Sequence, residues 1–294
     1  MNHGFEYREQ VGPEAAGRTV LDHLAASHRH STIAVWRERI DAGEVFLGEA
    51  RAAPTGVLRR GDWLAWRRPP WEEPPVPLAF AVLHRDDHLL AVAKPRGLPS
   101  VPNGGFLTHT LLHVVRGHFP EATPMHRLGR GTSGLLLFAR TAAARRAVSA
   151  SWRTGGVEKV YRALVSGIPE RREFTVEAPI GLVDHPRLGR LHAAAAGGKA
   201  AVSHVRILAV RNGDALAEVT IPTGRPHQIR IHLAAAGHPL VGDPLYVAGG
   251  GPAADGGLPG DAGYRLHAHR LRLAHPATGR DLDLECAPPP ELRE

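Results

Sequence analysis

At the centre of the chain, residues 125–134 read MHRLGRGTSG and lead directly into the apolar run LLLFA at residues 135–139. Five consecutive apolar residues, bounded by Gly134 and by the polar pair Arg140-Thr141, predict a short strand that is buried on both faces. The loop before this strand is dense in Arg, Gly, Thr and Ser. Loops of this kind at the edge of a rigid sheet commonly carry binding and catalytic groups. We therefore expect the functional site to be built around this loop.

The composition is that of a globular protein with a basic surface. The 294 residues are 43% hydrophobic and carry a formal net charge of +7, with a pI of about 10.2. This length is enough for one large domain or for a large and a small one, and the basic balance suits a polyanionic partner such as RNA. The single cysteine, Cys286, excludes an internal disulfide and fits a reducing compartment. With no apolar run of membrane-spanning length and no signal peptide at the start, we expect a cytoplasmic monomer.

The N-terminal part of the chain predicts a small α/β unit after an irregular arm at residues 1–15. Apolar residues recur at helical spacing over residues 19–25 and 33–40, and short strands are expected at 45–47 and near 63–64. This order of helix, helix, strand and strand resembles the S4 RNA-binding fold. The resemblance implies that the second helix presents Arg37 and Arg39 to RNA. A purely structural helical cap is the alternative interpretation.

A proline-rich stretch at residues 69–77 separates this unit from the rest of the chain. Its five prolines exclude a helix or a central strand and favour a stiff, extended spacer. We therefore predict an S4-like module at 1–68, a linker at 69–77 and a large domain at 78–294.

The large domain alternates predicted strands and helices. A hairpin is expected at residues 80–93, and a helix beginning at Pro226 is expected to end at Gly237. Residues 248–263 have no periodicity and predict a surface loop. Between and after these segments we expect helices at 107–115 and 142–152, strands at 135–139, 158–165, 175–176, 201–210 and 217–221, and a closing hairpin from 266.

Four motifs appear in the order typical of one enzyme family: KPRGL at 94–98, the loop at 125–134, EKVY at 158–161 and PTGRPHQIRIHL at 222–233. Together they resemble the RluA-type pseudouridine synthases over residues 78 to about 290. The resemblance implies an α+β domain with a mixed, mainly antiparallel sheet. It also implies isomerisation of uridine to pseudouridine in structured RNA, either ribosomal or transfer RNA, without metal or cofactor. The chain departs from the family at one point, since Gly129 stands where the family carries its catalytic Asp.

Residue roles follow from the same resemblance. Breaking the bond from ribose to N1, turning the base and rejoining it through C5 requires a uridine that has left its stack. Motif position makes Tyr161 the residue that stacks on the uracil, Arg230 the cation that orients the family's carboxylate, and Gly129 the vacated catalytic position. The side chains expected to contact RNA in this domain are Arg127, Arg130, Arg225 and His227.

Two questions stay open at the level of sequence. Arg230 needs an anion, and Asp243, Glu158 or an RNA phosphate are the candidates. Without the family's Asp, the chain is either an active synthase or a non-catalytic RNA-binding relative. Gly129 is also expected to turn the loop through a positive φ.

A metal site is not expected. His109 and His113 are four residues apart on a predicted helix, which is a spacing that can bind zinc, but the sequence offers no third ligand near them.

Overall fold

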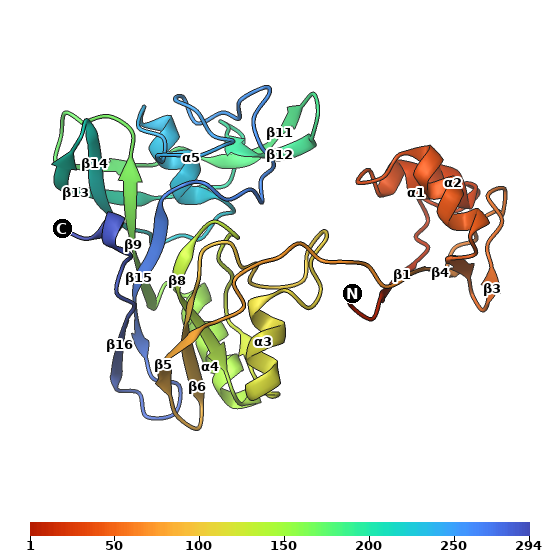
Figure 1. The fold of residues 1–294 in the computed structure, drawn as a ribbon, viewed down its shortest axis with the longest axis horizontal. Coiled ribbons are helices and arrows are strands. Elements are labelled where there is room, and N and C mark those ends of the chain that lie inside the picture. Colours follow the sequence, from red (N-terminus) through yellow and green to blue (C-terminus); the bar gives the residue numbers. More distant parts are fainter. The chain divides into compact units, whose positions relative to one another are not determined.

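The structure is a computed structural model that describes all 294 residues, and its chain forms two compact units, Met1–Glu73 and Pro74–Glu294 (Figure 1). The division falls inside the proline-rich stretch. None of the helices combines the length and the apolar character needed to cross a bilayer.

The first unit is a four-stranded antiparallel sheet with two helices. The sheet order is β1 (Phe5–Gln10), β4 (Trp63–Arg68), β2 (Val45–Leu47) and β3 (Ala50–Arg51), and the helices are α1 (Val20–Ser27) and α2 (Ile33–Asp41). Thr19 and Thr32 cap the two helices by accepting backbone N–H bonds, which fixes where each helix begins. Trp36 and Trp66 are the largest side chains of the unit's core and are 1% and 8% exposed.

The expectation of an irregular arm at residues 1–15 is wrong, because β1 pairs with β4 from Phe5 opposite Arg68 to Gln10 opposite Trp63. Five of its six residues are exposed, so no apolar alternation marks the strand in the sequence. Backbone hydrogen bonds and the stacking of Tyr7 on Trp66, with 5.2 Å between ring centroids, hold it instead.

The second unit is built on a ten-stranded sheet in which every pairing is antiparallel except that of β8 with β15. This confirms the predicted fold class, an α+β domain with a mixed, mainly antiparallel sheet. A separate hairpin, β11 (Ile180–His185) with β12 (Gly189–Ala194), was not predicted. The strands of the sheet are β5 (Ala81–Arg85), β6 (Leu89–Lys94), β7 (Thr123–Pro124), β8 (Ser133–Ala139), β9 (Val157–Val165), β10 (Glu173–Val176), β13 (Ser203–Arg211), β14 (Asp214–Thr220), β15 (Leu266–Ala274) and β16 (Asp281–Glu285).

Strand β8 is buried on both faces, as its apolar run predicts. Leu135 and Leu137 pack with α4 (Ala142–Arg153), while Leu136 and Phe138 pack with α3 (Leu111–His118). Figure 1 shows both helices beside this part of the sheet. The strand therefore alternates between two cores along its length. Its first residues pair with β15, where a side chain on Gly134 would meet the backbone of Ala268.

Two helix starts differ from the predictions. Helix α3 begins at Leu111 rather than at residue 107, because the Thr110 side chain accepts a hydrogen bond from the N–H of His113 and caps it there. Helix α5 (Gln228–Ala235) begins two residues after Pro226, because His227 adopts a left-handed backbone with a φ of 55°. Gly237 follows the end of α5 with a φ of 89°, as predicted. A short 3-10 helix, η1 (Pro290–Leu292), lies near the end of the chain.

Each unit has a hydrophobic core made only of its own residues. We therefore predict that residues 74–294 fold when expressed alone. The core of the first unit consists only of residues from Val11 to Trp66, and the four cores of the second unit consist only of later residues. Chemical denaturation should show one cooperative transition with a free energy of unfolding within about 1 kcal/mol of the same transition in the full chain. An insoluble or non-cooperative fragment would contradict the independence of the two cores.

Candidate functional site

A buried ion pair lies at the centre of the second unit. Arg230 on α5 donates from Nε to Oδ2 of Asp243 and from Nη2 to Oδ1, both at 2.7 Å, and from Nη1 to the carbonyl of Pro259 at 3.0 Å. The two side chains are only 3% and 1% exposed. Among the anions considered from the sequence, Asp243 is therefore the partner of Arg230.

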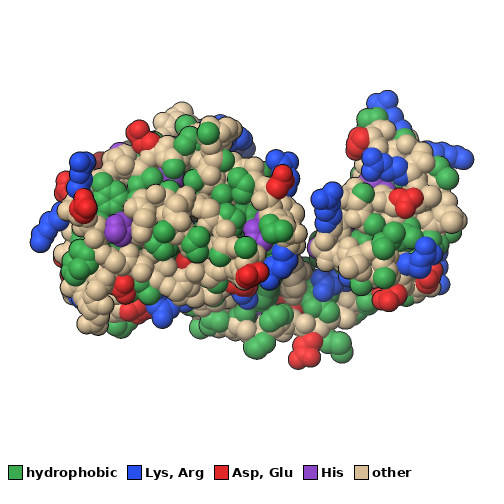
Figure 2. All heavy atoms as spheres, turned by 90° about the horizontal axis from the view of Figure 1, so that it is seen from above, with side chains coloured by type: hydrophobic (Ala, Val, Ile, Leu, Met, Phe, Trp, Pro, Cys, Tyr) green, Lys and Arg blue, Asp and Glu red, His purple; other side chains and the backbone are tan.

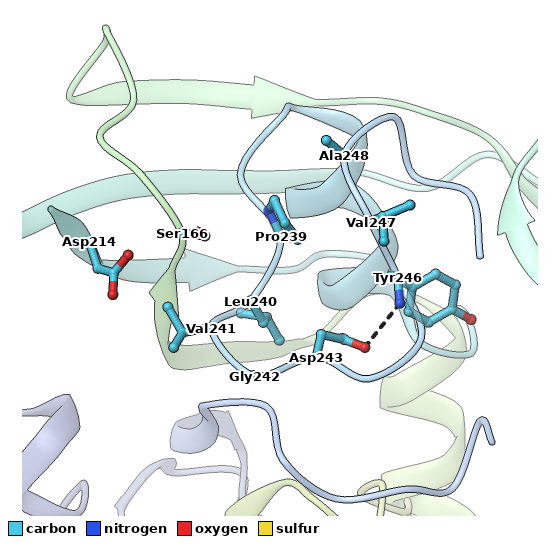
Figure 3. Close-up of a pocket in the computed structure, with 10 residues that line it drawn as sticks. All are labelled: Ser166, Asp214, Pro239, Leu240, Val241, Gly242, Asp243, Tyr246, Val247 and Ala248. Carbon is cyan, nitrogen blue, oxygen red and sulfur yellow. Dashed lines mark hydrogen bonds between the residues drawn. The ribbon is translucent and has the colours of Figure 1, made fainter. Parts of the chain in front are cut away.

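The Asp243 carboxylate also organises the loop after α5. Its Oδ1 atom accepts the backbone N–H groups of Leu245 and Tyr246 at 2.9 and 3.1 Å (Figure 3). Burial acts to lower the pKa of Arg230, but the hydrogen bonds and negative charge of Asp243 outweigh it and raise that pKa. The guanidinium is therefore charged at every accessible pH.

Two tyrosine rings enclose this guanidinium. Its Cζ atom lies 4.9 Å from the ring centroid of Tyr246 and 4.3 Å from that of Tyr264. Both rings are almost fully buried, so the cation–π attraction acts in a dry environment where it is worth about 2 kcal/mol. An open pocket of about 280 Å³ lies beside this cluster and is lined by Asp243, Tyr246 and neighbouring residues, with Asp214 among the other lining groups (Figure 3).

Tyr264 also fills the space next to Gly129. Its hydroxyl lies 3.2 Å from Oγ1 of Thr132, and a Cβ atom added to Gly129 would stand 2.6 Å from the hydroxyl oxygen. A Cβ atom on Gly131 would stand 2.8 Å from the ring itself. The predicted positive φ at Gly129 is wrong, because Gly129 is not among the glycines with positive φ. The close approach of Tyr264, rather than backbone conformation, requires glycine here.

Three buried contacts hold the signature loop, residues 125–134, in place. His126 accepts the N–H of Leu137 at 3.0 Å through Nε2, and its ring stacks on Trp152. Ser100 exchanges hydrogen bonds with the backbone of Leu128. The Nζ atom of Lys94 donates to the carbonyls of Leu98 and Arg130 at 2.7 and 3.4 Å, although burial lowers the pKa of Lys94 to about 7.

Tyr161 lies on β9 between two cores of the unit. Its half-buried ring packs with Leu128 and Ala268 on one side and with the cluster that contains Tyr264 on the other. Burial raises the pKa of Tyr161 to about 12, and its hydroxyl makes no hydrogen bond within the chain. The sequence motifs therefore converge: the signature loop and Arg230 meet at Tyr264, and Tyr161 packs against the apolar cluster that includes Tyr264.

The side chains predicted to contact RNA occupy different environments. Arg127 is exposed. Arg130 is tied to the carbonyl of Gly260 at 2.9 Å, and Arg225 to that of Ala200 at 3.0 Å. In the first unit, Arg37 is exposed, whereas the guanidinium of Arg39 is packed against two tryptophan rings.

His227 is a neutral imidazole rather than a cation. Burial, followed by the positive charge of Arg230, lowers the pKa of His227 to about 4. The Tyr246 hydroxyl donates to the carbonyl of His192 at 2.7 Å, so it accepts from Nδ1 of His227 at 2.8 Å. His227 is also the N-cap residue of α5, with a left-handed backbone, but its side chain makes no capping hydrogen bond to the helix.

His109 and His113, whose spacing could bind zinc on a helix, do not lie on one helix. His109 precedes the start of α3 and contacts the carbonyl of Pro74 through Nδ1 at 2.8 Å.

The sequence reasoning missed Tyr264 and Tyr246 as members of the site. The sequence marks these two tyrosines only by their rarity and position, since the chain has four tyrosines and these two flank the aperiodic segment 248–263.

Comparison with known proteins identifies the family of this chain. A family model described as RNA pseudouridylate synthase matches residues 88–235. An uncharacterised RNA pseudouridine synthase of Synechocystis is 42% identical over 93% of this chain and 95% of its own length. The chain belongs to the RNA pseudouridylate synthase family.

Other pseudouridine synthases give the same picture. RNA pseudouridine synthase 5 of Arabidopsis thaliana is 37% identical over 93% of this chain and 89% of its own length, and ribosomal large subunit pseudouridine synthase D of Neisseria meningitidis is 32% identical over 95% and 77%. The solved structure of human RNA pseudouridylate synthase domain containing 1 shares the fold, with a TM-score of 0.57 at 24% identity over 76% of this chain and 89% of its own. Within the pseudouridylate synthase match lie the signature loop, Tyr161 and Arg230, while Asp243 and Tyr264 follow it in the chain.

Proposed function

We propose that this protein is an RNA pseudouridine synthase that isomerises uridine to pseudouridine in structured RNA, ribosomal or transfer RNA, as a cytoplasmic monomer without a cofactor. The observation that carries the proposal is the convergence of the signature loop, Tyr161 and the Arg230–Asp243 pair in one place. Membership of the family supports the same conclusion.

The reaction is an isomerisation, so its atoms balance without a second substrate. The bond from N1 to C1′ breaks, the uracil turns, a bond forms from C5 to C1′, and a proton leaves C5 while N1 gains one. Tyr161 offers a half-buried ring with an unengaged hydroxyl, which suits stacking on an extruded base. Arg127, exposed on the signature loop, is suited to a phosphate of the RNA backbone.

Asp243 takes the place of the missing carboxylate in this proposal. It is the acid that pairs with Arg230, and Asp243 lines the neighbouring open pocket although its side chain is only 1% exposed. Gly129 has no functional group, so position 129 serves the proposed site only by leaving room for Tyr264.

RNA binding draws on basic side chains of both units. Figure 2 shows Lys and Arg side chains dispersed among other residues over the face in view rather than gathered in one patch. In the S4-like first unit, Arg37 on α2 is free to reach RNA, while Arg39 supports α2 by packing between Trp36 and Trp66, with its Cζ 4.6 and 4.2 Å from their ring centroids.

A second candidate function, RNA binding without turnover, is favoured by two observations. The Tyr264 hydroxyl closes the space at Gly129, and the Asp243 carboxylate already accepts four hydrogen bonds, two from Arg230 and two from backbone N–H groups. A carboxylate engaged in this way reacts only if the pair rearranges when RNA binds.

Conversion of uridine tests the proposal directly. The purified full chain should form pseudouridine in ribosomal or transfer RNA taken from a strain that lacks the gene, as mapped by chemical labelling and sequencing. Tyr161→Ala should slow conversion by about 5- to 150-fold, which corresponds to the 1–3 kcal/mol that stacking of one base contributes. Tyr161→Phe keeps an aromatic ring and should therefore keep the contribution of stacking to the rate. Leu182→Ala, an exposed substitution on β11, is the matched control and should leave the rate unchanged. If no uridine is converted in vitro and none loses its modification in the deletion strain, the protein is not a synthase.

Substitution at position 129 separates the two candidate functions. Gly129→Asp alone should lower stability by about 1–3 kcal/mol, because the new side chain meets the Tyr264 hydroxyl. Gly129→Asp combined with Tyr264→Phe should recover most of that loss, since the phenylalanine lacks the colliding oxygen. If the wild type is active, the double variant should convert uridine at a similar rate. If the wild type only binds RNA, the double variant should begin to convert uridine, because a carboxylate has returned to the loop. Gly251→Ala, where an added Cβ meets nothing within 4 Å, controls for the loss of a glycine.

A further inference from the structure

Three potential metal ligands meet in the first unit. Glu9 on β1 receives the Nε2 atoms of His23 at 2.9 Å and of His28 at 3.1 Å, both on the same oxygen, Oε1. These three ligand atoms lie within 4.8 Å of one another. His23 is on α1, and His28 is the residue that ends it.

The donor set is that of a zinc site with an open fourth position. Two imidazoles and one carboxylate are common ligands of Zn²⁺, with Zn–N distances of about 2.0–2.1 Å and Zn–O distances of about 2.0–2.2 Å. A tetrahedral ion requires its ligand atoms to be roughly 3.4 Å apart. The two nitrogens would therefore move away from Oε1 by a few tenths of an ångström, and they would adjust their separation from each other, which is at most 4.8 Å. Glu9 and His28 have that freedom, because each side chain is 37% exposed.

The Ser27 hydroxyl can accept a proton from the tautomer of His23 that a metal site requires. The Nδ1 atom of His23 lies 3.4 Å from Oγ of Ser27, and the His23 side chain is 8% exposed. A proton on Nδ1 that is directed at Ser27 leaves the Nε2 lone pair pointing at Glu9, which is the tautomer that binds metal. Without a metal, both histidines must instead carry their proton on Nε2 to share the single acceptor oxygen of an ionised Glu9.

We propose that Glu9, His23 and His28 form a Zn²⁺ site that fastens β1 to the end of α1. The fourth ligand is water, since the carboxylate and His28 face solvent. The site has a structural consequence for α2, because the carbonyl of His28 accepts the indole N–H of Trp36 at 3.1 Å. Trp36 in turn packs on Arg39, so the ion steadies the helix that carries Arg37.

Zinc binding to the full chain, freed of metal with a chelator, tests the site. Titration calorimetry with a zinc salt should give one ion per chain, and Co²⁺ in its place should show the intense visible absorption of a tetrahedral ion. Glu9→Gln and His28→Gln should each weaken binding at least about tenfold, since even the loss of a group that only supports a ligand lowers metal affinity about 10- to 100-fold.

Two matched variants control for the 19 histidines of the chain. His3→Gln lies in the same unit and His113→Gln in the other, and neither residue belongs to the cluster, so both should bind zinc as the wild type does. Glu9 and His28 are partly exposed, and circular dichroism of their variants checks that the fold persists. The site does not exist if the chain binds no zinc, if binding is equally strong in Glu9→Gln and His28→Gln, or if Co²⁺ gives only the weak absorption of an octahedral ion.

Discussion

The ion pair of Arg230 and Asp243 is almost excluded from water, and it joins three separate segments of the second unit. Arg230 belongs to α5, Asp243 to the loop after it, and Pro259 to the aperiodic segment that returns towards the sheet. Removing one partner of such a pair costs about 3–5 kcal/mol, because the other charge is left buried. The remaining features of the site are arranged around this constraint.

Tyr264 packs between Arg230 and the signature loop and so links their positions. One face of its ring lies against the guanidinium, and its hydroxyl and edge occupy the space beside Gly129 and Gly131. The carboxylate that pairs with Arg230 belongs to the loop after α5, and the signature loop contributes no carboxylate. The glycine at position 129 and the buried tyrosine are thus two parts of one packing arrangement.

Sequence reasoning reached the fold class and most elements because strong patterns mark them. The apolar run of β8, the glycine at the end of α5 and the EKVY strand each leave a local signal, whereas β1 leaves none because backbone pairing holds it with its side chains in solvent. Tyr264 could not be foreseen for a related reason. It comes directly after a segment without periodicity, and only the folded chain brings it against Gly129, 135 positions earlier in the sequence.

A double-mutant cycle on the ion pair tests the central claim most directly. The free energy of unfolding is measured for the wild type, Arg230→Met, Asp243→Leu and the double variant. We predict that each single change costs about 3–5 kcal/mol, and that the double variant loses far less than their sum because no unpaired charge remains buried. Additive losses, within about 0.5 kcal/mol, would show that the two side chains do not act as a pair and would contradict the central place of Arg230 and Asp243 in the site.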